Sequence, residues 1–302
     1  MGHLLTQIQK LSLLFVRIIA ESKQRVQLLT TGGGGMAKMK SGFTPTRSND
    51  EIRQIDITLD FTPNALASVL YRQGNTMILA CVTKERSLPR WFPRDATKGW
   101  VHAEYSLMPA STDSRFRRER NGAKGRTQEI ERLVARSLRA AVDLEALGPI
   151  ALNIDCDVLN ADGGTRCASI TAAGIALRLA IRRLISQGIC LPADRREEGS
   201  EGKVELTQEE AMNHENSVMP HDVAAISVGL LEGEVYADLD YDLDSNADVD
   251  MNIVMTSDQK FVEVQGTGEE ATYSSEELDA LISSGKIAIE QLFAIQKSTL
   301  SE

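Results

Sequence analysis

Two short segments combine glycine and arginine where a helix is expected to begin. They are Gly125-Arg126-Thr127 and Asp162-Gly163-Gly164-Thr165-Arg166. Free backbone N–H groups at a helix N-terminus can bind an anion, glycine lets the backbone approach it, and arginine adds a two-pronged donor. The second segment matches neither the P-loop nor the dinucleotide fingerprint. These features predict a phosphate site without a nucleotide motif, with a tight turn capped by Thr165 as the purely structural alternative.

A basic stretch leads into the first of these segments. Residues 111–126 hold six Lys and Arg against two acids, Asp113 and Glu119, and one aromatic residue, Phe116. A basic loop with an aromatic side chain can follow the backbone of single-stranded RNA while a base stacks on the ring. A solvated loop is the alternative. The arginines expected to contact RNA are Arg115, Arg117, Arg118 and Arg120.

Six aspartates and no basic residue lie in the stretch from Asp238 to Asp250. Such a density of carboxylates indicates a hard divalent cation, for which an EF-hand is the first motif to test. A loop starting at Asp240 would need glycine at position 245 and glutamate at position 251, where the chain has serine and methionine. The EF-hand is therefore excluded.

Strict alternation of apolar and acidic residues predicts a strand over 234–243. Its acidic face would hold Asp238, Asp240 and Asp242, and a solvated strand face is the alternative role for these three. Asp244 at the strand end and Asp250 at the start of the next strand would meet across the turn at 245–247. Two carboxylates placed in this way can hold Mg²⁺, which takes its other ligands from water and substrate phosphates.

The elements that must position these residues follow from the periodicity of apolar residues. Alternation over 55–84, with two turn signals, predicts strands joined by hairpins. Helical spacing runs from residue 127 to Gly148-Pro149, and a strand over 151–159 precedes a helix over 165–187. Further strands are expected over 224–231, 251–256 and 261–265, and a capping box at 274–277 opens the last helix. Hairpins mixed irregularly with helices predict an α+β fold, not a doubly wound parallel sheet.

Composition adds limits on partners and location. The 302 residues carry 43 acids and 33 bases, a net charge of −10 that by itself disfavours nucleic acid. The acids are segregated, however, in the aspartate stretch and in an acidic surface insertion expected at about 193–221, so RNA contact would be local and salt-sensitive. Four scattered cysteines indicate reduced thiols in a cytoplasmic protein, and no apolar run is long enough to span a membrane.

The first 44 residues differ from the rest of the chain. They hold six Lys and Arg against one acid, and they contain four consecutive glycines at 32–35. This composition predicts an N-terminal extension, either a helix on a flexible tether or a start-site artefact if translation begins at Met36 or Met39. Residues 45–302 would form the catalytic domain.

Taken together, several segments resemble the ribonuclease PH family over residues 45–297. The matching segments are 99–105, 125–130, 155–166, 250–256 and 263–267. The resemblance implies a fold of the ribosomal protein S5 domain 2-like type, with mixed and antiparallel sheets and packed helices. It also implies a homohexamer built as a trimer of dimers. Lys124, where the family commonly has glycine, is a departure, as are the N-terminal extension and the acidic insertion.

The resemblance also implies an activity and residue roles. The activity is phosphate-dependent 3′-to-5′ exoribonuclease trimming of tRNA precursors, which releases nucleoside diphosphates and runs in reverse as nucleotidyl transfer. Asp244 and Asp250 would be the catalytic, metal-linked carboxylates, and the arginines of the basic loop would guide the RNA tail. Inorganic phosphate would be bound by Arg126, Gly164, Thr165 and Arg166. The rivals are a hydrolytic exoribonuclease and a non-catalytic RNA-binding ring subunit of an exosome-like assembly.

Overall fold

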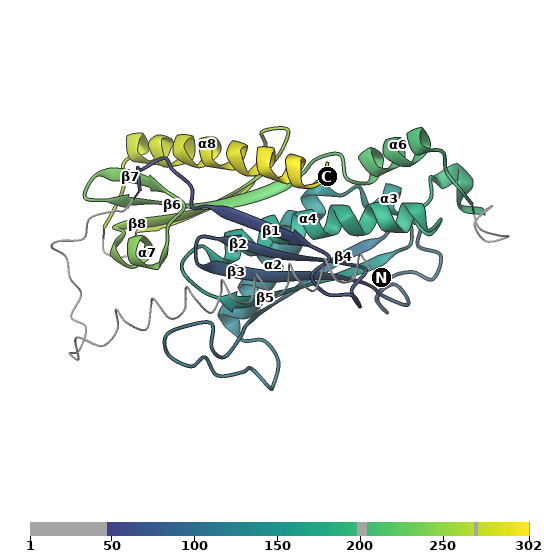
Figure 1. Cartoon of the computed structure of the whole chain (residues 1–302), viewed down its shortest axis with the longest axis horizontal. Coiled ribbons are helices and arrows are strands. Elements are labelled where there is room, and N and C mark those ends of the chain that lie inside the picture. Colours follow the sequence, from purple (N-terminus) through teal and green to yellow (C-terminus); the bar gives the residue numbers. More distant parts are fainter. Residues whose placement is uncertain (1–46, 198–203, 269–270, 302) are drawn as a thin grey trace, which may run out of the picture. The chain divides into compact units, whose positions relative to one another are not determined.

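A computed structural model describes residues 47–197, 204–268 and 271–301 (Figure 1). The predicted N-terminal extension, residues 1–44, lies outside the described residues, as does part of the acidic insertion, residues 198–203. Within the described ranges, the helices are too short or too polar for a membrane-spanning segment. None of the four cysteines forms a disulfide, and three of them are buried.

Two β-sheets form the framework. The first has the order β1-β2-β3-β5-β4, made of β1 (Ile55–Leu59), β2 (Ala67–Gln73), β3 (Thr76–Lys84), β5 (Ala151–Asn160) and β4 (Trp100–Leu107). Its strands pair antiparallel, apart from the parallel pair β4 and β5. The second sheet is antiparallel with the order β7-β6-β8-β9, made of β7 (Glu234–Ala237), β6 (Val223–Leu231), β8 (Val249–Thr256) and β9 (Phe261–Gly268).

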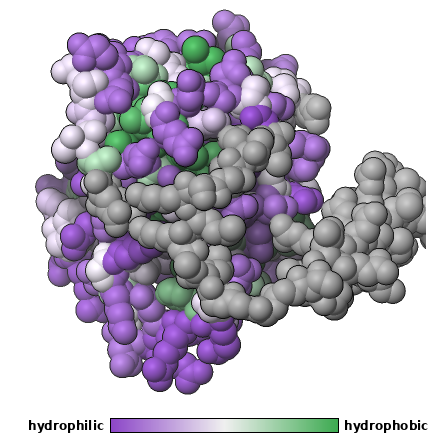
Figure 2. Space-filling view, turned by 90° about the vertical axis from the view of Figure 1, so that its left-hand side faces the viewer, coloured by the Kyte–Doolittle hydropathy of each residue, from purple (hydrophilic) through white to green (hydrophobic). Residues whose placement is uncertain are grey.

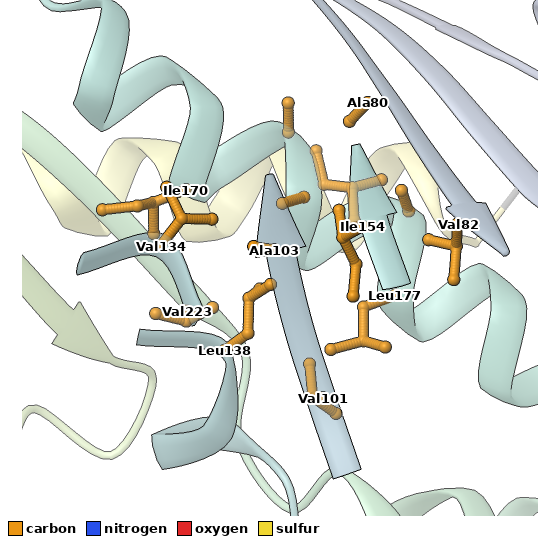
Figure 3. Close-up of a cluster of buried hydrophobic side chains, with 14 of the residues drawn as sticks. Ala80, Val82, Val101, Ala103, Val134, Leu138, Ile154, Ile170, Leu177 and Val223 are labelled. Carbon is orange, nitrogen blue, oxygen red and sulfur yellow. The ribbon is translucent and has the colours of Figure 1, made fainter. Parts of the chain in front are cut away.

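Helices α2 (Gly125–Ala141) and α4 (Thr165–Ser186) pack between the two sheets, and α8 (Ser275–Thr299) covers the other face of the second sheet (Figure 1). Sixteen of the 22 residues of α4 are buried, because both sheets and α2 surround it. Figure 3 shows the core that results, in which Val101, Ala103 and Ile154 of the first sheet meet side chains from both helices and from β6, among them Val134, Leu138, Ile170, Leu177 and Val223. This packing fixes where α2 and α4 begin.

The expected α+β class and most expected elements are confirmed. The hairpin turn at residues 73–76 joins β2 to β3, and the alternating residues Leu152, Ile154, Cys156 and Val158 of β5 are all buried. The helix expected over 127–147 is present as two pieces, α2 and the short α3 (Leu144–Leu147). Ser274 and Glu277 form the predicted capping box at the start of α8.

The strand predicted over 234–243 is wrong beyond Ala237. Asp238 adopts a left-handed backbone with φ of 57°, which ends β7, and its carboxylate is buried against Arg53. Asp240 then accepts a hydrogen bond from the N–H of Leu243 at 2.9 Å and caps the short helix α7 (Tyr241–Asn246). Asp238, Asp240 and Asp242 therefore share no strand face, and Asp244 lies in a helix.

The described parts of the acidic stretch at 193–221, residues 193–197 and 204–221, contain helices. After a short 3-10 helix (Ala193–Arg195), it contains α6 (Gln208–Val218), whose capping box is formed by Thr207 and Glu210. His214 and Val218 are buried where α6 packs on α3 and α4. Glu215 pairs with Arg178 and Arg182 of α4. This part of the stretch is therefore a packed helix.

Candidate active site

The N-termini of α2 and α4 differ from those of the other described α-helices. Neither has a side-chain cap or an acidic residue in its first turn, and each carries a basic residue there, Arg126 and Arg166. The other α-helices are capped by the side chains of Asp143, Thr207, Asp240 and Ser274. A cation at the positive end of a helix dipole is unfavourable by itself but favours an anion bound at that end.

The charges of both arginines act on one buried phenol. The hydroxyl of Tyr105 in β4 lies 2.9 Å from the hydroxyl of Thr165, the first residue of α4. Burial raises the pKa of Tyr105, and the positive charges of Arg126 and Arg166 act against that rise, which places both charges near the phenol. The structure thus brings together the two arginines that the sequence singled out 40 positions apart.

Arg166 is held in place by two polar neighbours, whereas Arg126 is exposed. One terminal nitrogen of Arg166 donates a hydrogen bond to Gln265 in β9 at 3.1 Å, and the other lies 3.6 Å from the carboxylate of Glu129 in α2. The Arg126 side chain makes no hydrogen bond or ion pair with any residue in the described ranges. Its guanidinium is therefore available to a ligand.

The turn that precedes α4 requires glycine at two adjacent positions. Gly163 and Gly164 have φ of 73° and 62°, in the left-handed region that other residues avoid. A Cβ added at Gly163 would lie only 2.4 Å from the carbonyl oxygen of Leu239. The turn therefore packs directly against the chain that enters α7.

Asp244 and Asp250 approach the same end of α4 from two elements. Asp244 is an exposed residue of α7, and Asp250 is a half-buried residue of β8. Burial raises the pKa of Cys167 in the first turn of α4 to about 12, and the charge of Asp244 adds to that rise. Asp250 lies on the same face of β8 as Asn252, which accepts a hydrogen bond from the Cys167 thiol at 3.1 Å. Both carboxylates thus lie near the start of α4.

The predicted metal site has two carboxylates from this chain. Among the residues that the structure describes, no group of three or more His, Cys, Asp and Glu side chains is placed to hold a metal ion. A pair of carboxylates is nevertheless the protein contribution that Mg²⁺ commonly has when substrate phosphates complete its coordination.

The basic loop lies between β4 and α2. It projects from the lower edge of the molecule in Figure 1 and forms the hydrophilic projection at the bottom of Figure 2. Arg115, Arg117, Arg118 and Arg120 are all exposed. The backbone N–H of Phe116 donates a hydrogen bond to the carbonyl oxygen of Pro109 at 2.9 Å. The Phe116 ring is half-buried. Lys124, the departure from the family, has an extended backbone with φ of −102°, so it introduces no strain at the start of α2.

Sequence reasoning from residue types missed several residues of this site. Tyr105 and Gln265 contact Thr165 and Arg166, although neither type suggests a phosphate site. Asn252 and Gln265 are opposite each other in the β8–β9 register, so only strand pairing brings them together. Arg53 was also missed, because its partner Asp238 is 185 positions away. No local pattern marks any of these contacts.

Comparison with known proteins identifies the family of this chain. Residues 51–182 match the model of the 3′ exoribonuclease family, domain 1, and residues 221–288 match domain 2 of that family. The chain is 44% identical to ribonuclease PH of Rhodopirellula baltica over 87% of this chain and 99% of that one. It is 45% identical to ribonuclease PH of Corynebacterium diphtheriae, over 85% and 96% of the two chains.

Solved structures with the same fold include rice Rrp46 and chains of archaeal exosomes. Rice Rrp46 aligns with a TM-score of 0.62 at 18% identity and covers 84% of this chain and 98% of its own. A chain of the Archaeoglobus fulgidus exosome with RNA bound to the active site aligns with a TM-score of 0.62 at 20% identity, over 82% and 90% of the two chains. From its sequence relatives and from its fold, this chain belongs to the 3′ exoribonuclease family, in the group that contains ribonuclease PH.

Proposed function

We propose that this protein is a phosphate-dependent 3′-to-5′ exoribonuclease that trims the 3′ ends of tRNA precursors and releases nucleoside diphosphates. The observation that carries the proposal is the proximity of two helix N-termini, each without a side-chain cap and each bearing an arginine. The Arg166–Glu129 contact at 3.6 Å joins them, and the Tyr105–Thr165 contact lies at the start of α4. Two carboxylates, Asp244 and Asp250, lie near the same helix end.

Inorganic phosphate is the co-substrate that suits the arginine half of the site. Arg126 and Arg166 each offer a planar fork of donors to phosphate oxygens, and the Thr165 hydroxyl and the backbone at Gly164 lie beside them. The anion also gains from the dipoles of α2 and α4. Because these groups bind an anion and not a base, they do not select the nucleotide to be removed.

Mg²⁺ is the metal ion that suits the carboxylate half. Asp244 and Asp250 are hard oxygen ligands, and two such ligands fit an ion that keeps waters and takes further ligands from phosphates. When bound, Mg²⁺ supplies positive charge against which the charge of a transferring phosphoryl group can develop. The carboxylates of this chain hold and orient that charge next to the phosphate site.

The reaction needs no covalent intermediate with the protein. An oxygen of inorganic phosphate forms a bond to the phosphorus of the last phosphodiester, and the bond from that phosphorus to the upstream 3′ oxygen breaks. The proton of the attacking hydrogen phosphate balances the new 3′ hydroxyl. Arg126 and Arg166 hold the attacking phosphate in line, so that the main contributions are positioning and electrostatic stabilisation. The reverse reaction adds a nucleotide and releases phosphate.

The RNA tail would reach this site along the basic loop. Its four exposed arginines provide phosphate contacts without sequence preference, and Phe116 provides a ring beside them. A chain of an exosome with RNA bound to its active site and a chain of an archaeal exosome core have the same fold, which supports an RNA-binding assembly of several subunits. We propose a homohexamer, a trimer of dimers, that works in the cytoplasm. A non-catalytic ring subunit is less well supported, because the curated relatives are ribonucleases and both arginines and both carboxylates are present.

The product nucleotide tests the proposal. Purified protein is incubated with a tRNA carrying a short 3′ tail, with and without inorganic phosphate and Mg²⁺, and the released nucleotides are separated by chromatography. Nucleoside diphosphates that appear only with phosphate are the expected result. Nucleoside monophosphates released without phosphate would instead identify the hydrolytic rival, and an intact tail under all conditions would indicate the non-catalytic subunit.

A further inference from the structure

Arg53 and Asp238 form a buried ion pair beside the turn that opens α4. The Arg53 guanidinium donates two hydrogen bonds to the Asp238 carboxylate, at 3.0 Å and 2.6 Å, and the Arg53 backbone N–H donates a third at 2.7 Å. The two side chains are 7% and 1% exposed. Burial alone would raise the pKa of Asp238, but the charge and hydrogen bonds of Arg53 hold it below its usual value.

The remaining nitrogen of Arg53 reaches the turn itself. It donates a hydrogen bond to the carbonyl oxygen of Asp162 at 2.5 Å. Next to it, the hydroxyl of Thr76 in β3 donates to the carbonyl oxygen of Gly163 at 2.7 Å and accepts the N–H of Asp162 at 3.1 Å. The carbonyl groups of two successive residues of the turn are therefore fixed by side chains from outside it.

Fixing these carbonyls also fixes the amides that follow them. In a trans peptide the C=O and the next N–H point in opposite directions, and the described residues contain no cis peptide. The N–H groups of Gly163 and Gly164 must therefore point away from Arg53 and Thr76. Neither N–H donates a hydrogen bond to a described residue. Successive free amides of this kind form a concave anion-binding surface.

The same pair reaches the carboxylate half of the site. The N–H groups of Asp238 and Leu239 donate to the carbonyl and the hydroxyl of Ser227 in β6, at 2.7 Å and 3.1 Å. Asp240 then caps α7, the helix that contains Asp244. Because Gly163 is in close contact with Leu239 and Asp240, the turn and the start of α7 pack as one unit around the ion pair.

We propose that Arg53 and Asp238, together with Thr76, are positioning residues that hold the amides of Gly163 and Gly164 toward the attacking phosphate. They would also fix this turn against α7. The inference rests on the proposed phosphorolytic function. A buried ion pair adds little stability compared with apolar packing, so its network of contacts points to placement of the turn as its purpose.

The first test replaces Arg53 with lysine. Lysine keeps the charge, but its single ammonium group cannot make the fork to Asp238 and reach Asp162 at once. The KM for phosphate should rise by about tenfold, while the KM for RNA changes by less than about twofold, because a misplaced turn weakens phosphate binding alone. Titration calorimetry with inorganic phosphate in the absence of RNA should show the same weakening.

A matched control separates placement from general loss of stability. Arg178 in α4 is also buried, pairs with Asp222 and Glu215, and donates to the carbonyl of Met219, far along the helix from the turn. Arg178→Lys should lower the melting temperature and leave the KM for phosphate unchanged. Equal effects of Arg53→Lys and Arg178→Lys on that KM would overturn the proposal.

A second pair of variants covers the case in which Arg53→Lys does not fold. Thr76→Val removes the hydroxyl that fixes Gly163 at nearly constant volume, and Thr76→Ser keeps it. The valine variant should raise the KM for phosphate by about fivefold and the serine variant should restore it. A wild-type KM in Thr76→Val would refute the positioning role. Failure of the proposed function looks different, because the unmodified protein would then show no phosphate requirement.

Discussion

The hydroxyl of Tyr105 lies 2.9 Å from the hydroxyl of Thr165, and this contact joins an edge strand of the first sheet to the first residue of α4. Tyr105 is buried, and its pKa is raised mainly by that burial, so the phenol stays protonated and neutral at physiological pH. It can therefore orient the Thr165 hydroxyl at the start of α4, next to Arg166.

Tyr105→Phe removes this contact without changing the packing of the ring. We expect a rise of about threefold to tenfold in the KM for phosphate, the range that corresponds to one lost hydrogen bond. Steady-state kinetics over a series of phosphate concentrations measures it. Tyr273→Phe, beside the cluster between α8 and the second sheet, is the control and should leave this KM unchanged. An unchanged KM in Tyr105→Phe would exclude any part for Tyr105 in phosphate binding.

Replacing either helix-start arginine should weaken phosphate binding and spare RNA binding. For Arg126→Ala and Arg166→Ala we expect the KM for phosphate to rise by about tenfold to a hundredfold, because each loses a charge-assisted contact. Arg136→Ala is a suitable control, since Arg136 also lies in α2 but pairs with Glu263. If either test variant trims RNA normally at low phosphate, the corresponding arginine has been misassigned.

Replacing the carboxylates of Asp244 and Asp250 should lower kcat and leave the affinity for RNA unchanged. Asp244→Asn and Asp250→Asn remove a charge with almost no change in shape, and we expect kcat to fall by about a hundredfold or more. RNA affinity, measured by fluorescence anisotropy, should stay close to that of the wild type. Asp242→Asn, also exposed in α7, is the control. Normal cleavage with an unchanged Mg²⁺ requirement in the two test variants would rule out a metal-linked role.

The basic loop should set the salt dependence of RNA binding. A variant with Arg115, Arg117, Arg118 and Arg120 changed to serine should bind a single-stranded tail more weakly at low salt. The slope of the logarithm of affinity against the logarithm of salt should become shallower, because fewer counterions are released. The two proteins should converge as salt rises. Parallel slopes would place the RNA path elsewhere.

Acid should loosen α6 through His214. Burial lowers the pKa of His214 below its usual 6.5, and its ring lies 3.6 Å from the Cys190 thiol, with Arg196 and Asp194 also acting on it. The unfolded chain binds the proton of His214 more readily than the folded chain does. The neutral, buried ring therefore contributes to the free energy of unfolding above the unfolded pKa, and this contribution is lost as pH falls through the folded pKa. Between about pH 8 and about pH 5, the melting temperature of the wild-type protein should fall further than that of His214→Gln. Equal losses would show that His214 contributes nothing.

Local patterns predicted the elements whose buried faces follow a simple period. The alternation in β5 and the capping box of α8 are visible within a few residues of sequence, and both were found at the expected positions. The arginines at 126 and 166 could be singled out because helix N-termini have a known preference for anions, which needs no knowledge of the fold. Their role in phosphate binding stays a prediction.

The strand prediction over 234–243 failed where a long-range contact overrides the local alternation of residues. Residues 238–243 read as a continuing strand, but the partner of Asp238 is Arg53, and that ion pair ends β7 and lets α7 begin. The placement of Gln265 against Arg166 likewise depends on the register of β9 against β8. No spacing within the sequence encodes either contact.

The fate of the attacking phosphate distinguishes phosphorolysis from hydrolysis in a single assay. The protein is incubated with unlabelled tailed tRNA, Mg²⁺ and radiolabelled inorganic phosphate, and the products are separated and counted. Phosphorolysis at Arg126 and Arg166 predicts label in the β-phosphate of the released nucleoside diphosphates, in equal amount to the nucleotides removed. Shortened RNA with unlabelled nucleoside monophosphates would exclude phosphorolysis and indicate hydrolysis.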